Sequence, residues 1–552
     1  MDETTGLGER RARTIVTVVL LAETVWVFLF KYLPLDAGLW SLQAELVRLH
    51  MAGHTNDGWR LIGFPASNVL ATLIAGIMTT VFSGEVVVRL LLTFGAIFLR
   101  GFGMLTLFRV LRVRDAGVYY LIPVLALTGL WFTGALPYLM AESLILWVLV
   151  FFLSQSYPRS ADYWILSIAF LFVSLLSGLA FFLSIFIVIM IMLEQRRNVH
   201  LSQGWLNEPR AVIGLLGLGA IPLLLGIIIG QPIMRLSSTL LLPSPNFGQL
   251  LFFLTPAPNV LEATFRYGHI LHILVAISFG IVVLGCFARA VLLAIEEVTW
   301  QSRAVRGAGY LLLVLALLGP LFSRIGIESG AGIILAVTLI LAGSYSRGPA
   351  VRRLAIDRLI YTLTVITVIA SLAINAYSIA AGSAAATDVL NSSRSLVSQE
   401  RERASQDEHL SNVNFRFVMD STLAAQTQLV ATLSYSATAP IYLFTEHGIL
   451  DQPSAFQPLG GLVRAKKADS IHTNGISPDI PLLLRSADKY IDSTVRILAA
   501  LSMGTHSSNA FGPFDMSLVE SAGINIDKGE VEYRLAIGKL RAGHPIELAS
   551  TK

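Results

Sequence analysis

Long apolar runs, separated by short polar stretches, fill the first 380 residues and then stop. About 20 apolar residues cross the hydrocarbon core of a membrane as a helix. The pattern therefore predicts an all-α polytopic domain over residues 1–380 with about eleven spans. The predicted spans are 15–34, 86–108, 117–135, 141–156, 162–176, 177–193, 211–231, 269–290, 308–323, 330–345 and 359–380.

Residues 381–552 have a different pattern, mixed and polar with frequent Pro, Gly, Asn and Ser. This change predicts a second domain, small, soluble and of mixed α and β structure. Its expected elements are helices within 396–436 and 482–503, strands or loops over 440–480, and a hairpin or helix over 529–548.

The composition supports a membrane protein. Hydrophobic residues make up 54% of the 552 residues and charged residues only 14%, with a mean hydropathy of +0.68. A soluble protein does not cover its surface with so few charges. The net charge of +4 is too small to indicate nucleic acid as a partner. Cys286, the only cysteine, lies in an apolar run, which excludes intramolecular disulfides and cysteine metal sites.

The distribution of Arg and Lys predicts the orientation. With the basic N-terminus in the cytoplasm, the inner loops hold 17 basic residues and the outer loops six, provided that 65–83 does not cross. Segment 65–83 is therefore predicted to be re-entrant or interfacial. Eleven spans then place 381–552 outside the cytoplasmic membrane. The first span lacks a small-residue cleavage site and is expected to be an uncleaved anchor.

The first outer loop, residues 33–68, contains an expected amphipathic helix over 37–52. Its leucines fall at helical spacing, which is typical of a helix in the membrane interface; a linker helix that seals the bundle is the alternative. Asp36 lies between the first span and this helix, where water meets the lipid headgroups. The leucines of the stripe are Leu39, Leu42, Leu46 and Leu49.

In this arrangement the sequence resembles the GT-C superfamily of membrane glycosyltransferases, which includes oligosaccharyltransferases, protein mannosyltransferases and aminoarabinose transferases. The superfamily pattern is one span, an outer loop that opens with an acidic residue, an interfacial helix that ends near Gly and His, and a Pro-containing segment. The resemblance covers about residues 10–200. It places Glu142 in a later short outer loop, where the family often has an Asp pair. The matching positions are Asp36, Gly53, His54, Pro65 and Arg89.

The resemblance implies a sugar transferase that uses a polyprenyl-phosphate donor and a glycan, lipid or protein acceptor. Asp36 would accept the proton of the acceptor hydroxyl, with Glu142 as a second catalytic carboxylate. A divalent metal on these two acids is left open. Basic outer residues would bind the donor phosphate, although each could instead contact membrane lipid. The candidates are His54, Arg60, Arg266, His269 and Arg324.

Two charged residues lie within predicted spans, Glu23 in the first and Arg100 in the second. Both fall about 12 Å from the cytoplasmic edge at 1.5 Å rise per residue. An unpaired charge there costs about 2.5 kcal/mol or more, so a structural Glu23–Arg100 pair is predicted, with a proton pathway as the alternative.

Two other functions compete with a transferase. One is a non-catalytic scaffold of the same fold, whose domain 381–552 binds partners of an envelope polysaccharide assembly. The other is a transporter, for which the sequence lacks paired interrupted helices.

Overall fold

The structure is a computed structural model. It describes residues 3–30, 69–113, 115–132, 134–154, 160–197, 209–228, 299–323, 327–346 and 361–376, together with parts of 37–51, 277–288 and 379–402. In the rest of the chain it describes, by their backbone, six strands at 59–61, 414–419, 463–465, 495–502, 514–526 and 529–540.

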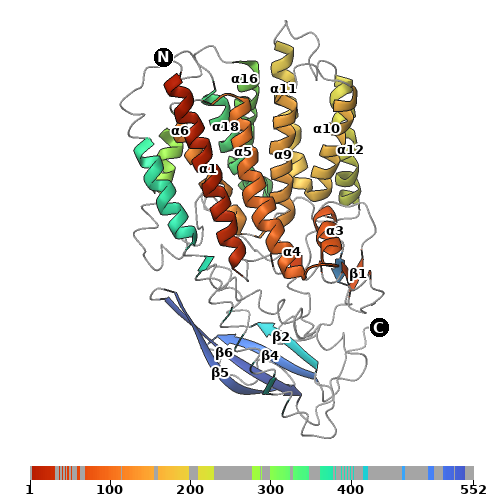
Figure 1. Ribbon diagram of the computed structural model, residues 1–552. Coiled ribbons are helices and arrows are strands. Elements are labelled where there is room, and N and C mark those ends of the chain that lie inside the picture. The colour runs from red at the N-terminus through yellow and green to blue at the C-terminus, as the bar shows by residue number, and fades with distance from the viewer. Residues whose placement is uncertain are drawn as a thin grey trace.

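Helices form one end of the molecule and a β-sheet the other (Figure 1). The helices are α1 (Glu3–Leu29), α3 (Val69–Met78), α4 (Gly84–Leu90), η1 (Leu91–Phe98), α5 (Leu99–Val110), α6 (Ala116–Tyr120), α7 (Ile122–Ala126), α8 (Gly129–Phe132), α9 (Leu136–Ser154), α10 (Ser160–Leu176), α11 (Gly178–Arg197), α12 (Pro209–Ile228), α16 (Trp300–Leu317), α17 (Gly319–Ser323), η3 (Ser329–Gly332) and α18 (Ile333–Ser344). Residues 361–376 are also helical.

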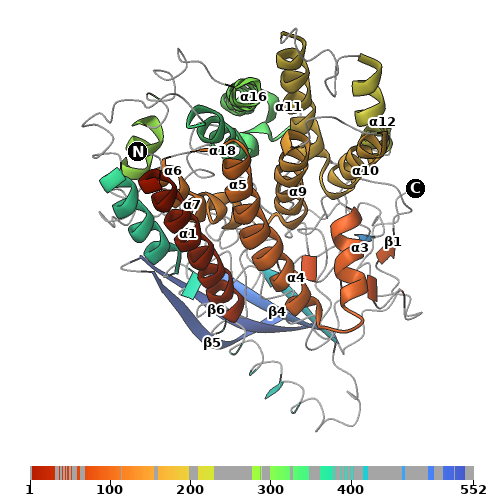
Figure 2. The same ribbon diagram turned by 45° about the horizontal axis from the view of Figure 1, so that its top comes forward.

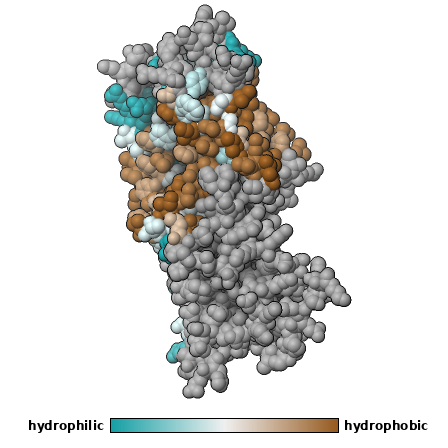
Figure 3. All heavy atoms as spheres, turned by 90° about the vertical axis from the view of Figure 1, so that its right-hand side faces the viewer, coloured by the Kyte–Doolittle hydropathy of each residue, from teal (hydrophilic) through white to brown (hydrophobic). Residues whose placement is uncertain are grey.

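Four helices of the described chain are long and apolar enough to cross a membrane: Gly8–Leu29, Gly84–Val110, Leu136–Ser154 and Gly178–Arg197. Large apolar side chains remain exposed on their neighbours, among them Trp164 at 66% and Ile228 at 79%. Figure 3 shows one such face, where the described side chains form a hydrophobic band. Such a surface suits lipid rather than water. The chain is therefore a multi-pass helical membrane protein, and the count of eleven spans stays a prediction.

The second spanning helix changes its winding in the middle. Residues 84–110 form one continuous rod in which Leu91–Phe98 are π-helical. A π-helix is rare and usually short because its wider turn loses contacts. Side chains from other helices donate hydrogen bonds to backbone carbonyls of this region. Two of these carbonyls belong to the π-helix: Trp131 Nε1 donates to Leu92 O at 3.0 Å, and Ser143 Oγ donates to Gly95 O at 3.0 Å. Trp147 Nε1 donates to Leu99 O, directly after the π-helix, at 3.1 Å.

The predicted span 117–135 is not one helix. It consists of the short helices α6, α7 and α8, and the chain leaves the helical conformation at Leu127 (φ −121°, ψ 75°). Pro123 lies in the first turn of α7, where its missing N–H does no harm. Gly134, at φ 67°, makes the turn into α9, because only glycine adopts that conformation without strain.

In the described part of segment 65–83, residues 69–83, the chain forms the ten-residue helix α3. At 1.5 Å per residue this helix is about 15 Å long, roughly half the hydrocarbon thickness. That 65–83 does not cross stays a prediction. Thr79–Ser83 then lead into α4, where the Ser83 hydroxyl accepts a hydrogen bond from the backbone N–H of Val86.

The sheet has the strand order β2-β4-β6-β5. Here β2 (Asn414–Met419) runs parallel to β4 (Val495–Ser502), while β4 with β6 (Gly529–Leu540) and β6 with β5 (Phe514–Ile526) are antiparallel. Residues 529–548 were expected to form a hairpin or a helix, but the described residues 529–540 are the single strand β6, which pairs with the preceding strand β5. The helices expected across 414–419 and 495–502 are wrong: short apolar runs suit either structure, and distant partner strands decide between them.

A second, two-stranded ribbon joins distant parts of the chain. Strand β1 (Trp59–Leu61), from the first loop, pairs antiparallel with β3 (Val463–Ala465), from the second domain. The N-terminus lies at the opposite end of the helical part from the four-stranded sheet, and β1 lies near α3 (Figures 1 and 2). Strand β1 and the four-stranded sheet therefore both lie toward the end of the helical part that is away from the N-terminus.

Candidate functional site

Arg89 caps the end of α1, from which the first loop departs. Its Nη1 donates to the Phe30 carbonyl at 3.2 Å, and its guanidinium lies 5.0 Å from the centre of the Phe28 ring. A cation at a helix C-terminus satisfies a free carbonyl and interacts well with the helix dipole. The stretch that leads to Asp36 therefore starts from a fixed point.

The expected interfacial helix is present in part, since the described residues of 37–51 are helical. Ala37, Trp40, Ala44 and Val47 are buried on it. The Thr79 hydroxyl lies 3.4 Å from the Ala44 carbonyl, so this face packs toward the α3 region. The predicted leucine stripe lies outside the described residues.

Gly76 of α3 sets this contact, because a Cβ atom there would lie 2.9 Å from the Cβ of Val47. We expect Gly76→Ala to push the two helices apart and lower the free energy of unfolding by about 1–3 kcal/mol. Thermal unfolding in detergent measures the effect. Gly217→Ala is the matched control, because a Cβ there meets nothing within 4 Å. Equal stability of the two variants would contradict the packing.

Deeper in the helical part, Arg100 and Glu142 form an ion pair between α5 and α9. Arg100 Nη2 lies 3.1 Å from Glu142 Oε2, and both side chains are completely buried. The contact is a close ion pair, and neither Glu142 oxygen has a further hydrogen-bond partner among the described residues. The prediction that Glu142 lies in an outer loop is wrong: it lies inside α9.

The predicted Glu23–Arg100 pair is also wrong. Glu23 is buried at 8% exposure, but its carboxylate oxygens have no hydrogen-bond partner among the described residues. Two residues at the same depth in the membrane, such as Glu23 and Arg100, can still point in different directions around their helix axes. The neighbouring Gly101 faces α1, since a Cβ there would lie 2.6 Å from Leu20 Cδ2. Arg100, one position earlier, points to α7 and α9 instead.

The interruption after α7 leaves backbone carbonyls without helical partners, and two long-range donors reach them. Arg100 Nη1 donates to Ala126 O at 3.2 Å, and Asn375 Nδ2 donates to Leu127 O at 2.9 Å. Irregular backbone at membrane depth is tolerated only where such groups are satisfied within the protein. Asn375 thereby ties the helix of residues 361–376 to the interrupted segment.

We expect Asn375→Leu to destabilise the fold, because the Leu127 carbonyl would be buried without this donor, at a cost of about 1–3 kcal/mol. Thermal unfolding in detergent again provides the measurement. Ser371→Ala, one turn earlier on the same helix, is the control: the Ser371 hydroxyl is buried without a hydrogen-bond partner in the described structure. An Asn375→Leu protein as stable as Ser371→Ala would refute the bond's role.

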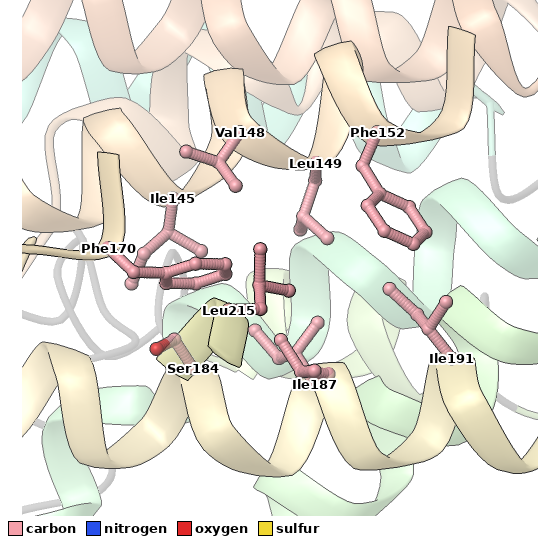
Figure 4. A pocket seen from close by; sticks show the side chains of 10 residues that line it. Ile145, Val148, Leu149, Phe152, Phe170, Ser184, Ile187, Ile191 and Leu215 are labelled. Atoms are coloured by element: carbon pink, nitrogen blue, oxygen red, sulfur yellow. The ribbon is translucent and has the colours of Figure 1, made fainter. Parts of the chain in front are cut away.

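An apolar pocket lies between α9, α10, α11 and α12, as Figure 4 shows. Its one polar side chain, Ser184, donates within its own helix to Phe181 O at 2.7 Å. No unsatisfied polar group therefore faces this pocket, and it carries no sign of catalysis. The other lining residues are Ile145, Val148, Leu149, Phe152, Phe170, Ile187, Val188, Ile191 and Leu215.

Most of the predicted outer-face residues lie outside the described chain, namely Asp36, His54, Arg266, His269 and Arg324. Arg60 is described by its backbone in β1. The described residues contain no group of three or more His, Cys, Asp or Glu that could hold a metal ion. Glu142 does not fit a metal, because Arg100 neutralises it and solvent does not reach it.

The sequence did not predict that Arg89 and Asn375 donate hydrogen bonds to backbone carbonyls of other helical segments. Both are polar side chains near the ends of apolar runs. A polar residue at membrane depth is a signal by itself, because it requires a partner there. The identity of the partner, a carbonyl at a helix end in each case, has no sequence signature.

These features define a multi-pass helical membrane protein with an additional sheet on one face. No protein-family model and no curated protein matches the chain. Among solved structures, the chain is similar to ArnT from Cupriavidus metallidurans. Its apo structure is 13% identical over 95% of this chain and 97% of that chain, with a TM-score of 0.39. Its structure with undecaprenyl phosphate is 13% identical over 96% and 99%, with a TM-score of 0.36. A TM-score below 0.5 does not establish a common fold.

Proposed function

We propose that the protein is a membrane glycosyltransferase that moves a sugar from a polyprenyl-phosphate donor to a glycan, lipid or protein acceptor. The reaction takes place at the membrane face that carries domain 381–552, which is the outer face of the cytoplasmic membrane. Asp36 is the general base in this proposal.

The proposal is supported by the contacts that hold the first loop on both sides of Asp36. Arg89 holds the end of α1, where the loop with Asp36 begins. Helix 37–51 packs toward the α3 region, and β1 joins the same loop to the second domain. A catalytic group must be held in place by rigid surroundings, and this loop is anchored before and after Asp36.

The chemistry needs one carboxylate and one phosphate-binding group. The Asp36 carboxylate takes the proton of the acceptor hydroxyl as that oxygen attacks the anomeric carbon. The bond between the anomeric carbon and the phosphate oxygen breaks, and the configuration at the carbon inverts. Cationic side chains stabilise the polyprenyl phosphate that leaves. His54, Arg60, Arg266, His269 and Arg324 are the candidates from the sequence.

The test is transfer by the purified full-length protein from a polyprenyl-phosphate sugar extract to an envelope extract. Release of polyprenyl phosphate that depends on both extracts supports a transferase. Absence of transfer across donor pools that support a known transferase would overturn the proposal.

A non-catalytic scaffold of an envelope assembly is the second candidate. The observation that favours it is the commitment of Glu142 to Arg100, which leaves Asp36 as the single acid of the proposed site. A scaffold would retain complex formation through 381–552 when Asp36 is replaced by Asn. A transferase would lose its product with the same substitution.

A further inference from the structure

Buried polar side chains gather around the interruption after α7. Arg100 and Asn375 donate to the carbonyls of Ala126 and Leu127, which are consecutive residues. Glu142 of α9 lies 3.1 Å from Arg100. Three helices and the interrupted segment thus bring polar groups to one place inside the helical part.

Several polar atoms of this cluster are buried without a hydrogen-bond partner in the part of the chain that the structure describes. They are Nε and Nη2 of Arg100, both carboxylate oxygens of Glu142, Oδ1 of Asn375 and Oγ1 of the adjacent Thr128. The four residues are at most 1% exposed, so bulk solvent does not reach them. Buried polar atoms in native proteins bond to protein or to ordered water, because an unsatisfied one loses its hydration without compensation.

The ion pair by itself does not satisfy these groups. A guanidinium carries five N–H donors, and a carboxylate accepts at about four positions. Arg100 makes one hydrogen bond, to Ala126, and one close contact with Glu142 within the described structure. Because the two charges cancel, the remaining donors and acceptors suit a small neutral molecule that both donates and accepts. Water has this chemistry.

We propose that Arg100, Glu142 and Asn375 form an internal water site beside the interrupted segment. Irregular backbone at membrane depth occurs where it is buried in protein or lines a water-filled cavity. Ionisable residues within membrane spans likewise face such cavities or one another. Both conditions meet at this site, which is independent of the sugar transfer proposed above.

The apolar pocket between α9, α10, α11 and α12 provides the contrast within the same molecule. Its one polar side chain, Ser184, is satisfied within its own helix (Figure 4). An apolar cavity stays dry, whereas a buried water needs about two to four polar partners. Helix α9 contributes Glu142 to the polar site and Ile145 to the pocket. We therefore expect a hydrated and a dry region along one helix.

The test is radiolytic footprinting of the full-length protein in detergent. Brief X-ray irradiation forms hydroxyl radicals from water, including bound water, and mass spectrometry locates the side chains that gain oxygen. Tyr138 is the reporter, because it lies one turn before Glu142 on α9 and interacts electrostatically with Glu142 and Arg100. Phe170 in the apolar pocket is the control, with an exposed fraction of 4% against 3% for Tyr138. We expect Tyr138 to gain oxygen at least about tenfold faster than Phe170, because only the polar site holds water.

The double variant Arg100→Leu with Glu142→Leu removes both ionic groups of the site. Oxidation of Tyr138 should then fall to the rate of Phe170. Ser184→Ala is the matched control in the dry pocket and should leave the Tyr138 rate as in the wild type. A size-exclusion profile equal to that of the wild type shows that each variant is folded.

Equal oxidation rates of Tyr138 and Phe170 in the wild type would overturn the water site, and this comparison needs no variant. Unchanged oxidation of Tyr138 in the folded double variant would also overturn it, because water would then reach Tyr138 without the polar groups.

Discussion

Replacing Asp36 by Asn is expected to reduce sugar transfer by about 10²- to 10⁴-fold, which corresponds to about 3–5 kcal/mol of activation free energy. Asparagine keeps the size and much of the hydrogen bonding of aspartate but does not accept the proton of the acceptor hydroxyl. The fold should change little, because the side chain keeps its size and shape. The measurement is release of polyprenyl phosphate by purified protein, with the unfolding midpoint recorded alongside.

Asp57→Asn is the matched control, because Asp57 belongs to the same loop, in the turn sequence Thr55-Asn56-Asp57-Gly58. Asparagine forms such turns as well as aspartate does, so this variant should transfer at the wild-type rate. Activity of Asp36→Asn within about threefold of wild type would show that another group accepts the proton.

Removing either partner of the buried ion pair is expected to cause the largest loss of stability. Arg100→Leu leaves the Glu142 carboxylate buried without its counter-charge, and also removes the donor to Ala126 O. Breaking one side of a buried pair costs about 3–5 kcal/mol. Glu142→Gln should cost less than Arg100→Leu, because the donor to the Ala126 carbonyl remains. Folded yield and unfolding midpoint in detergent measure both effects.

The double variant Arg100→Leu with Glu142→Leu distinguishes the loss of the ion pair from a destabilisation that any substitution at these sites would cause. It removes both charges, so it should be more stable than Arg100→Leu alone. Glu9→Gln is the control for an exposed pair: Glu9 and Arg13 lie 3.6 Å apart with side chains about one quarter exposed, and such pairs contribute about 0–1 kcal/mol. Strictly additive losses in the double variant would rule out coupling between Arg100 and Glu142.

Much of the architecture follows from the sequence, because the membrane imposes length and hydrophobicity on each helix. The long apolar runs predicted α1, α9 and α11. The distribution of Arg and Lys predicted that 65–83 does not cross, and this stays a prediction. The change after residue 380 predicted a separate domain, which stays a prediction; the described elements beyond residue 402 are strands. These features are local, so a window of the chain is enough to reveal them.

The partners of the charged residues were decided by tertiary structure alone. Arg100 was assigned to Glu23 by depth, yet it pairs with Glu142 because it faces α7 and α9 while Gly101 faces α1. The interruption at Leu127 is likewise stable only because Arg100 and Asn375 reach the freed carbonyls from other helices. The sequence by itself indicated that Glu23 and Arg100 are charged residues within apolar runs and need partners there. Which partner each one meets depends on the direction in which a helix presents it, and only the packed structure sets that direction.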